Sequence, residues 1–188
     1  MDAPQFRCEK RAEGELPSIT GYAALFDTPA DLGYFTESIA EGAFKASIDR
    51  GDDVRALFNH DVNLIIGRTS AKTLELREDE KGLFCRIIPP DTSLGRDLVV
   101  SIERGDISQM SFGFYIEREE SSYKDGKKPH FTILEARLFD VSPVTFPAYE
   151  ETKVEIERSR QERSRAVMDH ARAEHEKRSR SIKLFSLS

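Results

Sequence analysis

The stretch that decides the fold runs from residue 107 to residue 117 and reads Ile-Ser-Gln-Met-Ser-Phe-Gly-Phe-Tyr-Ile-Glu. Large apolar residues recur at every second position, a pattern that predicts a half-buried β-strand. The residues expected to pack on one face are Met110, Phe112, Phe114 and Ile116. Ser111 is then presented on the other face beside Gly113, with room for a substrate carbonyl and an oxyanion-binding N–H. The alternative is a small polar residue on a half-exposed strand.

The segments around this stretch also predict strands, with turn residues between them. The strand segments are residues 19–26, 54–60, 64–68, 73–77, 83–88 and 131–144. Residues 78–82 read Glu-Asp-Glu-Lys-Gly and predict a hairpin between two of them. An Asp-Gly turn within residues 123–128 precedes the last strand. The body is therefore expected to be mainly antiparallel β-sheet.

One segment has the periodicity of a helix. Its apolar positions, Leu94, Leu98, Val99 and Ile102, follow the spacing i, i+4, i+5 and i+8. This spacing predicts a helix over residues 92–104 that ends before Gly105. Residues 35–48 are expected to form a short helix or a loop over the sheet. The fold class is therefore α+β.

The charge distribution divides the chain of 188 residues into two parts. Residues 1–150 carry a formal charge of −9 and are expected to form one domain, whereas residues 151–188 carry +3 and form a tail. The tail is of low complexity, because Glu-Arg-Ser-Arg at 157–160 repeats at 162–165, and it is expected to be helical or disordered. We expect it not to pack, and its apolar end, residues 182–188, to form a docking segment. The formal net charge of −6 argues against a general nucleic-acid binder.

Cysteine usage and hydropathy exclude several classes of protein. Cys8 and Cys85 lie far apart without a CxxC motif, so we expect free thiols and neither a disulfide framework nor a zinc site. No apolar run approaches the roughly 20 residues of a membrane span, and the N-terminus lacks a stretch typical of a signal peptide. The protein is expected to act in the cytoplasm without contacting a membrane.

His60 is the candidate general base. It ends the apolar face formed by Val54, Ala56 and Phe58, where the core meets solvent. A histidine there accepts a hydroxyl proton, or is simply a hydrogen-bonded core residue. The other histidines fit this role less well: His130 borders a Lys-rich turn, and His170 and His175 lie in the tail.

Asp140 is the candidate partner of that histidine. It is expected to continue the apolar face of the strand 131–144, where an unpaired carboxylate is costly. Accepting one ring N–H fixes the tautomer whose other nitrogen takes a serine proton. The alternative is an ion pair with Arg68 or Arg137. Two other carboxylates compete for the orienting role, Asp61 and Glu135.

Five ordered segments within about residues 15–150 resemble a known family. They are Gly-Tyr-Ala-Ala-Leu-Phe (21–26), Glu-Ser-Ile-Ala-Glu-Gly-Ala-Phe (37–44), Asn-His-Asp (59–61) with Ile-Gly-Arg (66–68), Met-Ser-Phe-Gly-Phe (110–114), and Leu-Phe-Asp-Val-Ser (138–142) with Pro-Ala-Tyr (147–149). The chain is similar to the prohead proteases of tailed double-stranded DNA bacteriophages, the capsid maturation proteases.

The resemblance implies a serine endopeptidase with the fold of the herpesvirus assembly proteases, a β-barrel-like body surrounded by helices. It implies that His60 is the base and Ser111 the nucleophile, with an acidic residue, usually Glu, at the position of Asp140. Herpesvirus enzymes use a second histidine instead, and none stands in that segment. We expect backbone N–H groups near Ser111 or in the Gly67-Arg68 turn to bind the oxyanion.

The resemblance also implies the substrates and the place of action. The substrates are the scaffolding protein or the scaffolding segment of the major capsid protein, cleaved inside the immature capsid in the host cytoplasm, and self-processing is implied as well. No metal or organic cofactor is needed, and a homo-oligomer is compatible with the sequence. Two other classes stay open: a non-catalytic capsid-assembly or scaffold component with a protease-like body, and a nucleic-acid-binding protein that uses its Arg-Ser tail.

Overall fold

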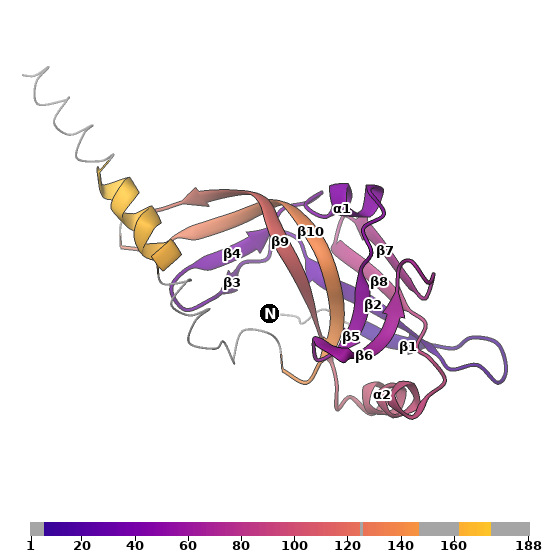
Figure 1. The fold of residues 1–188 in the computed structure, drawn as a ribbon. Coiled ribbons are helices and arrows are strands. Elements are labelled where there is room, and N and C mark those ends of the chain that lie inside the picture. Colours follow the sequence, from indigo (N-terminus) through magenta and orange to yellow (C-terminus); the bar gives the residue numbers. More distant parts are fainter. Residues whose placement is uncertain (1–5, 125, 147–161, 174–188) are drawn as a thin grey trace, which may run out of the picture.

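The computed structural model describes residues 6–124, 126–146 and 162–173, which form two β-sheets and a few helices (Figure 1). The first sheet is antiparallel throughout, in the order β1 (Phe6–Glu9), β2 (Ser18–Leu25), β8 (Gly82–Ile87) and β7 (Leu74–Asp79). The expected strand 19–26 and the hairpin around residues 78–82 are confirmed as β2 and as β7 with β8.

The second sheet is built around a long central strand, β10 (His130–Val144). On one side β10 pairs antiparallel with β9 (Gln109–Ser122) along its length. On its other side it pairs in parallel with β4 (Thr36–Ile39) near its start and with β5 (Arg55–Phe58) near its end. Two outer strands complete the sheet: β3 (Ala30–Asp31) beside β4, and β6 (Asp61–Arg68) beside β5. Most strand pairs are thus antiparallel, as expected.

The expected barrel-like closure is wrong for the described residues. Within these residues, the outer strands of the first sheet, β1 and β7, pair with no strand of the second sheet. The two sheets instead share one hydrophobic core, to which β2 and β8 contribute from one sheet and β5, β6, β9 and β10 from the other. The fold is therefore α+β with two open sheets.

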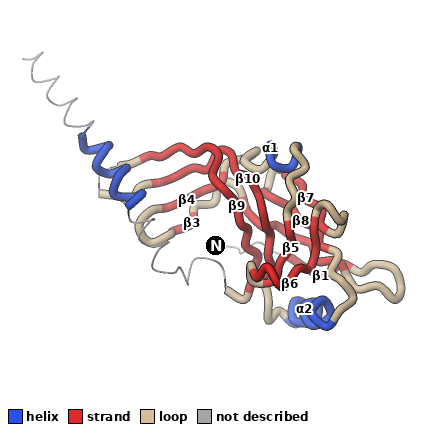
Figure 2. Tube along the Cα trace, in the orientation of Figure 1, coloured by secondary structure: helices blue, strands red, loops and turns tan. Residues whose placement is uncertain are grey.

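Two helices flank the body and lie at opposite ends of its strands (Figure 2). Helix α2 (Ser93–Arg104) confirms the predicted helix: the Thr92 hydroxyl accepts the Gly95 N–H, and Gly105 ends the helix with φ at 82°. Its apolar stripe enters the core. Helix α1 (Lys45–Asp49) follows β4, so residues 35–48, expected as a short helix or loop, begin with a strand. None of the helices in the described residues has the length and hydrophobicity to span a bilayer.

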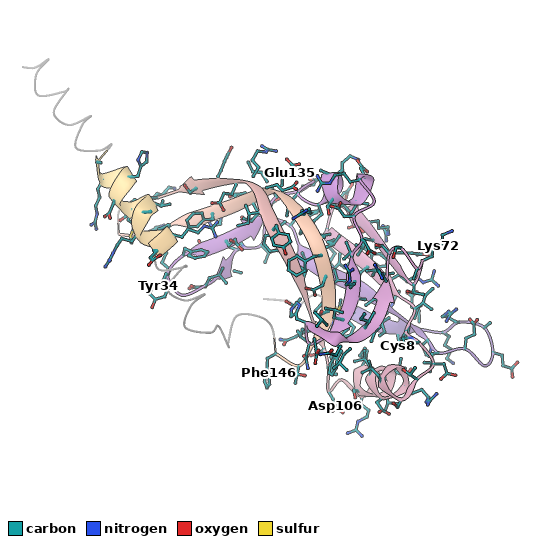
Figure 3. The ribbon with its side chains drawn as sticks, viewed as in Figure 1. Cys8, Tyr34, Lys72, Asp106, Glu135 and Phe146 are labelled. Atoms are coloured by element: carbon teal, nitrogen blue, oxygen red, sulfur yellow. The ribbon has the colours of Figure 1, made fainter. Side chains whose placement is uncertain are left out.

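Residues 162–173 are helical and contact the end of the β9–β10 hairpin (Figure 1). Val167 packs on a second cluster formed by Leu32, Phe35 and Phe131. The Ser164 hydroxyl donates to the Tyr34 carbonyl at 2.9 Å, and Tyr34 marks this end of the molecule in Figure 3. The expectation of an unpacked tail is therefore wrong for these residues, because they cover apolar side chains of the body. The expected docking segment, residues 182–188, lies outside the described residues.

Candidate active site

Ser111 lies on β9, where the register with β10 defines its neighbours. It stands opposite Ser142, and Gly113 stands opposite Asp140. Residues paired across antiparallel strands project to the same face, so these four residues share one face of the sheet. Met110, Phe112 and Phe114 pack into the core from the other face, as expected, whereas Ile116 is 43% exposed and does not pack as predicted.

A β-bulge directs Asp140 to the face of Ser111. Leu138 stands opposite Phe114, but Asp140 stands opposite Gly113, so Phe139 is an extra residue in β10. The extra residue reverses the alternation, and Asp140 no longer lies on the core face of Leu138. The expectation that Asp140 continues that apolar face is therefore wrong, because period-two counting fails across a bulge.

His60 lies in the tight turn between β5 and β6. Phe58 pairs with Asp61, and the two residues between them, Asn59 and His60, have φ values of 54° and 57°. Both central residues of a type I′ hairpin turn need positive φ, which Asn and His tolerate better than most residues. His60 is thus a turn residue. The prediction that it ends the strand face of Ala56 is wrong.

The backbone and the side chain of Asn59 both attach this turn to the end of β10. The Asn59 N–H donates to the Pro143 carbonyl at 3.0 Å, and its side-chain oxygen accepts the Thr145 N–H at 2.8 Å. A further bond joins its side-chain amide to the Thr145 hydroxyl. These contacts fix the turn beside β10, where His60 reaches Asp140.

The His60 Nδ1 and Asp140 Oδ1 atoms lie 2.7 Å apart, a hydrogen bond between ring and carboxylate. Asp140 is 3% exposed, whereas the His60 side chain is 32% exposed. Because an ionised carboxylate only accepts hydrogen bonds, His60 Nδ1 is the donor in this bond. The same Asp140 oxygen accepts the Ser142 hydroxyl at 2.8 Å.

The alternative partners weighed from the sequence make other contacts. The Asp61 carboxylate accepts the Asn63 N–H, and Glu135 lies 3.8 Å from Arg118. Arg68 pairs with Asp53, and the Arg137 guanidinium lies over the Tyr115 ring. The alternative of an ion pair between Asp140 and either arginine is therefore wrong.

Ser111 lies near Asp140 on the paired strand but, in the part of the chain that the structure describes, is not hydrogen-bonded to it. It is 7% exposed and lies diagonally across the strand pair from Asp140, about 7–8 Å between Cα atoms. Within the described residues, no hydrogen bond joins the Ser111 hydroxyl to the His60 ring. Catalytic hydrogen bonds are often long in unliganded enzymes, so this arrangement is compatible with proton transfer once a substrate is bound.

Gly113 has a different role from the one the sequence indicated. A Cβ on Gly113 would lie 2.2 Å from Asp140 Oδ2 and 2.4 Å from the Phe139 ring. The space left by the missing side chain is therefore occupied by the Asp140 carboxylate and the Phe139 ring and is not kept for substrate. Neither this role nor the Ser142 contact follows from the sequence, because both depend on the bulge and on strand register.

The expected oxyanion turn is also different in the structure. Gly67 and Arg68 are the last residues of β6, paired with Ala56 and Arg55 of β5. The Arg68 N–H already donates to the Thr73 hydroxyl at 2.9 Å. The expectation that residues 67 and 68 form a turn is therefore wrong. Backbone N–H groups near Ser111 are still the proposed donors to the oxyanion.

Among the residues that the structure describes, the cysteines and acidic side chains offer no second site. Burial, with a smaller effect of Glu103, raises the pKa of Cys8 to about 11, and burial raises that of Cys85 to about 12, so both free thiols stay protonated at neutral pH. Among the described residues, no three His, Cys, Asp or Glu side chains are grouped to hold a metal ion.

Comparison with known proteins identifies a family for most of the chain. Residues 5–166 match the family described as caudovirus prohead serine protease. No curated protein and no solved structure matches the chain. The match covers the two sheets, the His60 turn and the Ser111 strand. The chain therefore belongs to the prohead serine proteases of tailed phages.

Proposed function

We propose that this chain is a serine endopeptidase in which Ser111 is the nucleophile, His60 the general base and Asp140 the residue that orients His60. The observation that carries the proposal is the 2.7 Å bond between His60 Nδ1 and Asp140 Oδ1, on the sheet face that Ser111 shares. Family membership supports serine peptidase chemistry for this arrangement.

The proposed reaction proceeds by acyl transfer. His60 Nε2 takes the Ser111 hydroxyl proton while Oγ attacks the scissile carbonyl, forming a tetrahedral oxyanion. The C–N bond breaks as the imidazolium gives that proton to the leaving amine, and an acyl ester remains on Ser111. Water then attacks the ester, gives one proton to His60 and releases the carboxylic acid product, and the proton returns to Ser111.

The proposed substrates follow from the family. A prohead protease acts in the immature capsid, so the substrate is the scaffolding protein or the scaffolding segment of the major capsid protein. Cleavage there clears the interior of the shell. The Arg-rich residues 151–188, apart from the helix at 162–173 that packs on the body, are a proposed site of self-processing, since chain ends are where proteolytic cleavage concentrates.

The test uses full-length wild type, Ser111→Ala and His60→Ala. Each protein is purified and treated with a fluorophosphonate probe, and in a separate assay each is co-expressed with capsid protein. Only wild type is expected to be labelled at Ser111 and to yield capsid-protein fragments by mass spectrometry. Loss of either group typically lowers kcat on the order of 10⁴- to 10⁶-fold. Retained cleavage by Ser111→Ala would reject the assignment.

Two further outcomes are informative. Folded wild type that is neither labelled nor active would favour a non-catalytic assembly component. Intact-mass measurements test self-processing: wild type is expected to lose part of residues 151–188, whereas Ser111→Ala stays full length. Equal trimming of both proteins would point to host proteases.

A further inference from the structure

Ser142 is a buried serine for which the proposed reaction has no use. It is fully buried, at 0% exposure, and lies two residues after Asp140 on the same face of β10. Its hydroxyl lies 2.8 Å from Asp140 Oδ1, the same oxygen that accepts His60 Nδ1 at 2.7 Å. Because an ionised carboxylate has no proton to donate, the Ser142 hydroxyl is the donor.

Ser142 and Ser111 stand opposite one another across the strand pair but are not equivalent. The Ser142 hydroxyl donates to Asp140 and is closed off from solvent, so it does not reach a peptide. Ser111 retains 7% exposure, and within the described residues its hydroxyl makes no hydrogen bond to that carboxylate. Ser142 is therefore excluded as a second nucleophile.

The carboxylate of Asp140 needs more than its own rotamer to hold its direction. The terminal torsion of an aspartate is broad, so packing and hydrogen bonds must select one orientation. On one side Oδ2 fills the space above Gly113, and on the other Oδ1 receives two donors. Of those donors only Ser142 belongs to the same strand as Asp140, so its position is fixed independently of the His60 turn.

We propose that Ser142 is a positioning residue that holds Asp140 Oδ1 where it receives the His60 Nδ1 proton. The inference rests on the proposed function and adds a fourth residue to it. Ser142 thereby maintains the tautomer in which His60 Nε2 is free to accept the Ser111 proton. Without its hydroxyl, the buried carboxylate turns toward other donors and the ring loses its fixed orientation.

The substitution to examine is Ser142→Ala in the full-length protein. Misplacement of a reacting group by about 1 Å lowers rates up to roughly a hundredfold, so kcat/KM is expected to fall about ten- to a hundredfold. Ser47→Ala is a stringent control, because Ser47 is 1% exposed, its hydroxyl donates to the Asp52 carboxylate at 2.7 Å, and it also accepts the Leu138 N–H of β10 at 3.0 Å. Loss of a buried serine-to-carboxylate bond is thus common to both variants.

The decisive readout is ¹⁵N NMR of the histidine side chains, which distinguishes the two ring tautomers and detects the Nδ1 proton bonded to a carboxylate. In wild type and Ser47→Ala, His60 is expected to carry its proton on Nδ1. In Ser142→Ala, the two tautomers are expected to mix and the bonded proton to exchange faster. An unchanged His60 signal in folded Ser142→Ala overturns the proposal.

Ser142→Cys is the second variant, needed in case Ser142→Ala does not fold. The thiol is a weaker donor of similar shape, so an intermediate tautomer ratio is expected. A wild-type ratio in Ser142→Cys also counts against the proposal. These spectra need no turnover, so the two proposals can fail separately. If wild type is not labelled at Ser111 but Ser142→Ala alters the His60 signal, only the protease function is rejected. If wild type is labelled normally but Ser142→Ala leaves the His60 signal unaltered, only the role of Ser142 is rejected.

Discussion

Gly113→Ala tests whether the space above Gly113 belongs to the Asp140 carboxylate. The ideal Cβ would lie 2.2 Å from Asp140 Oδ2, whereas ordinary contact begins at 3.4 Å. The carboxylate must therefore retreat by about 1 Å, which lengthens its 2.7 Å bond to His60. The backbone of Gly113 does not have positive φ, so the new methyl group acts through steric clashes alone, with the Asp140 carboxylate and with the Phe139 ring at 2.4 Å.

Two magnitudes follow from this displacement. Overpacking of a well-filled site costs typically about 1–3 kcal/mol of the free energy of unfolding. A shift of about 1 Å in a catalytic group lowers kcat/KM up to roughly a hundredfold. We therefore expect a modest loss of stability together with a much larger loss of activity per folded molecule.

The assay measures urea unfolding and the rate of fluorophosphonate labelling for each variant. Gly67→Ala is the matched control, because its Cβ would meet the Thr73 carbonyl at 2.8 Å and Ile87 at 3.0 Å, away from Asp140. It is expected to lose stability but to keep the labelling rate of its folded fraction. A Gly113→Ala protein that is labelled at the wild-type rate when folded would refute the reasoning.

Three further predictions concern the triad, the helix and acid stability. Asp140→Asn is expected to lower kcat by about 10⁴-fold while Asp61→Asn stays near wild type in peptide-cleavage kinetics, and the reverse result would identify Asp61 as the orienting residue. Gly105→Ala is expected to cost about 1–2 kcal/mol in urea unfolding, since its φ is 82°, and an unchanged midpoint would contradict this cap. Hydrogen bonds from Arg50 and then Ser47 lower the pKa of Asp52, so its stabilisation is present above the unfolded pKa and is lost as pH falls through the folded value. Asp52→Asn should therefore flatten the fall in stability below about pH 4, and an unaltered urea midpoint-versus-pH curve would contradict this.

The sequence predicts the elements whose signals are local. Helix α2 is recognisable from its apolar spacing and from Gly105 at its end, all within residues 92–105. The β7–β8 hairpin likewise depends on a turn and two adjacent strands. Such elements are predictable because their caps, turns and periodicity interact with near neighbours in the chain.

Residue type and family resemblance point to Ser111, His60 and Asp140 from the sequence alone, although the catalytic roles stay predictions. The sequence pattern places two of these residues incorrectly in detail. Asp140 is expected on the core face and His60 at the end of a strand, whereas a bulge at Phe139 and a two-residue turn position them. Both errors arise because period-two counting assumes unbroken alternation.

Only the tertiary structure decides which groups meet. Ser142, Asp140 and Gly113 come together through the register of β9 on β10, and His60 joins them because β5 lies on the other side of β10. The contacts of residues 162–173 with Phe35 and Phe131 are likewise invisible in a charged, repetitive sequence. The sequence determines residue type and local periodicity, but contacts between distant segments depend on strand order and register, which are set by the packing of the whole core.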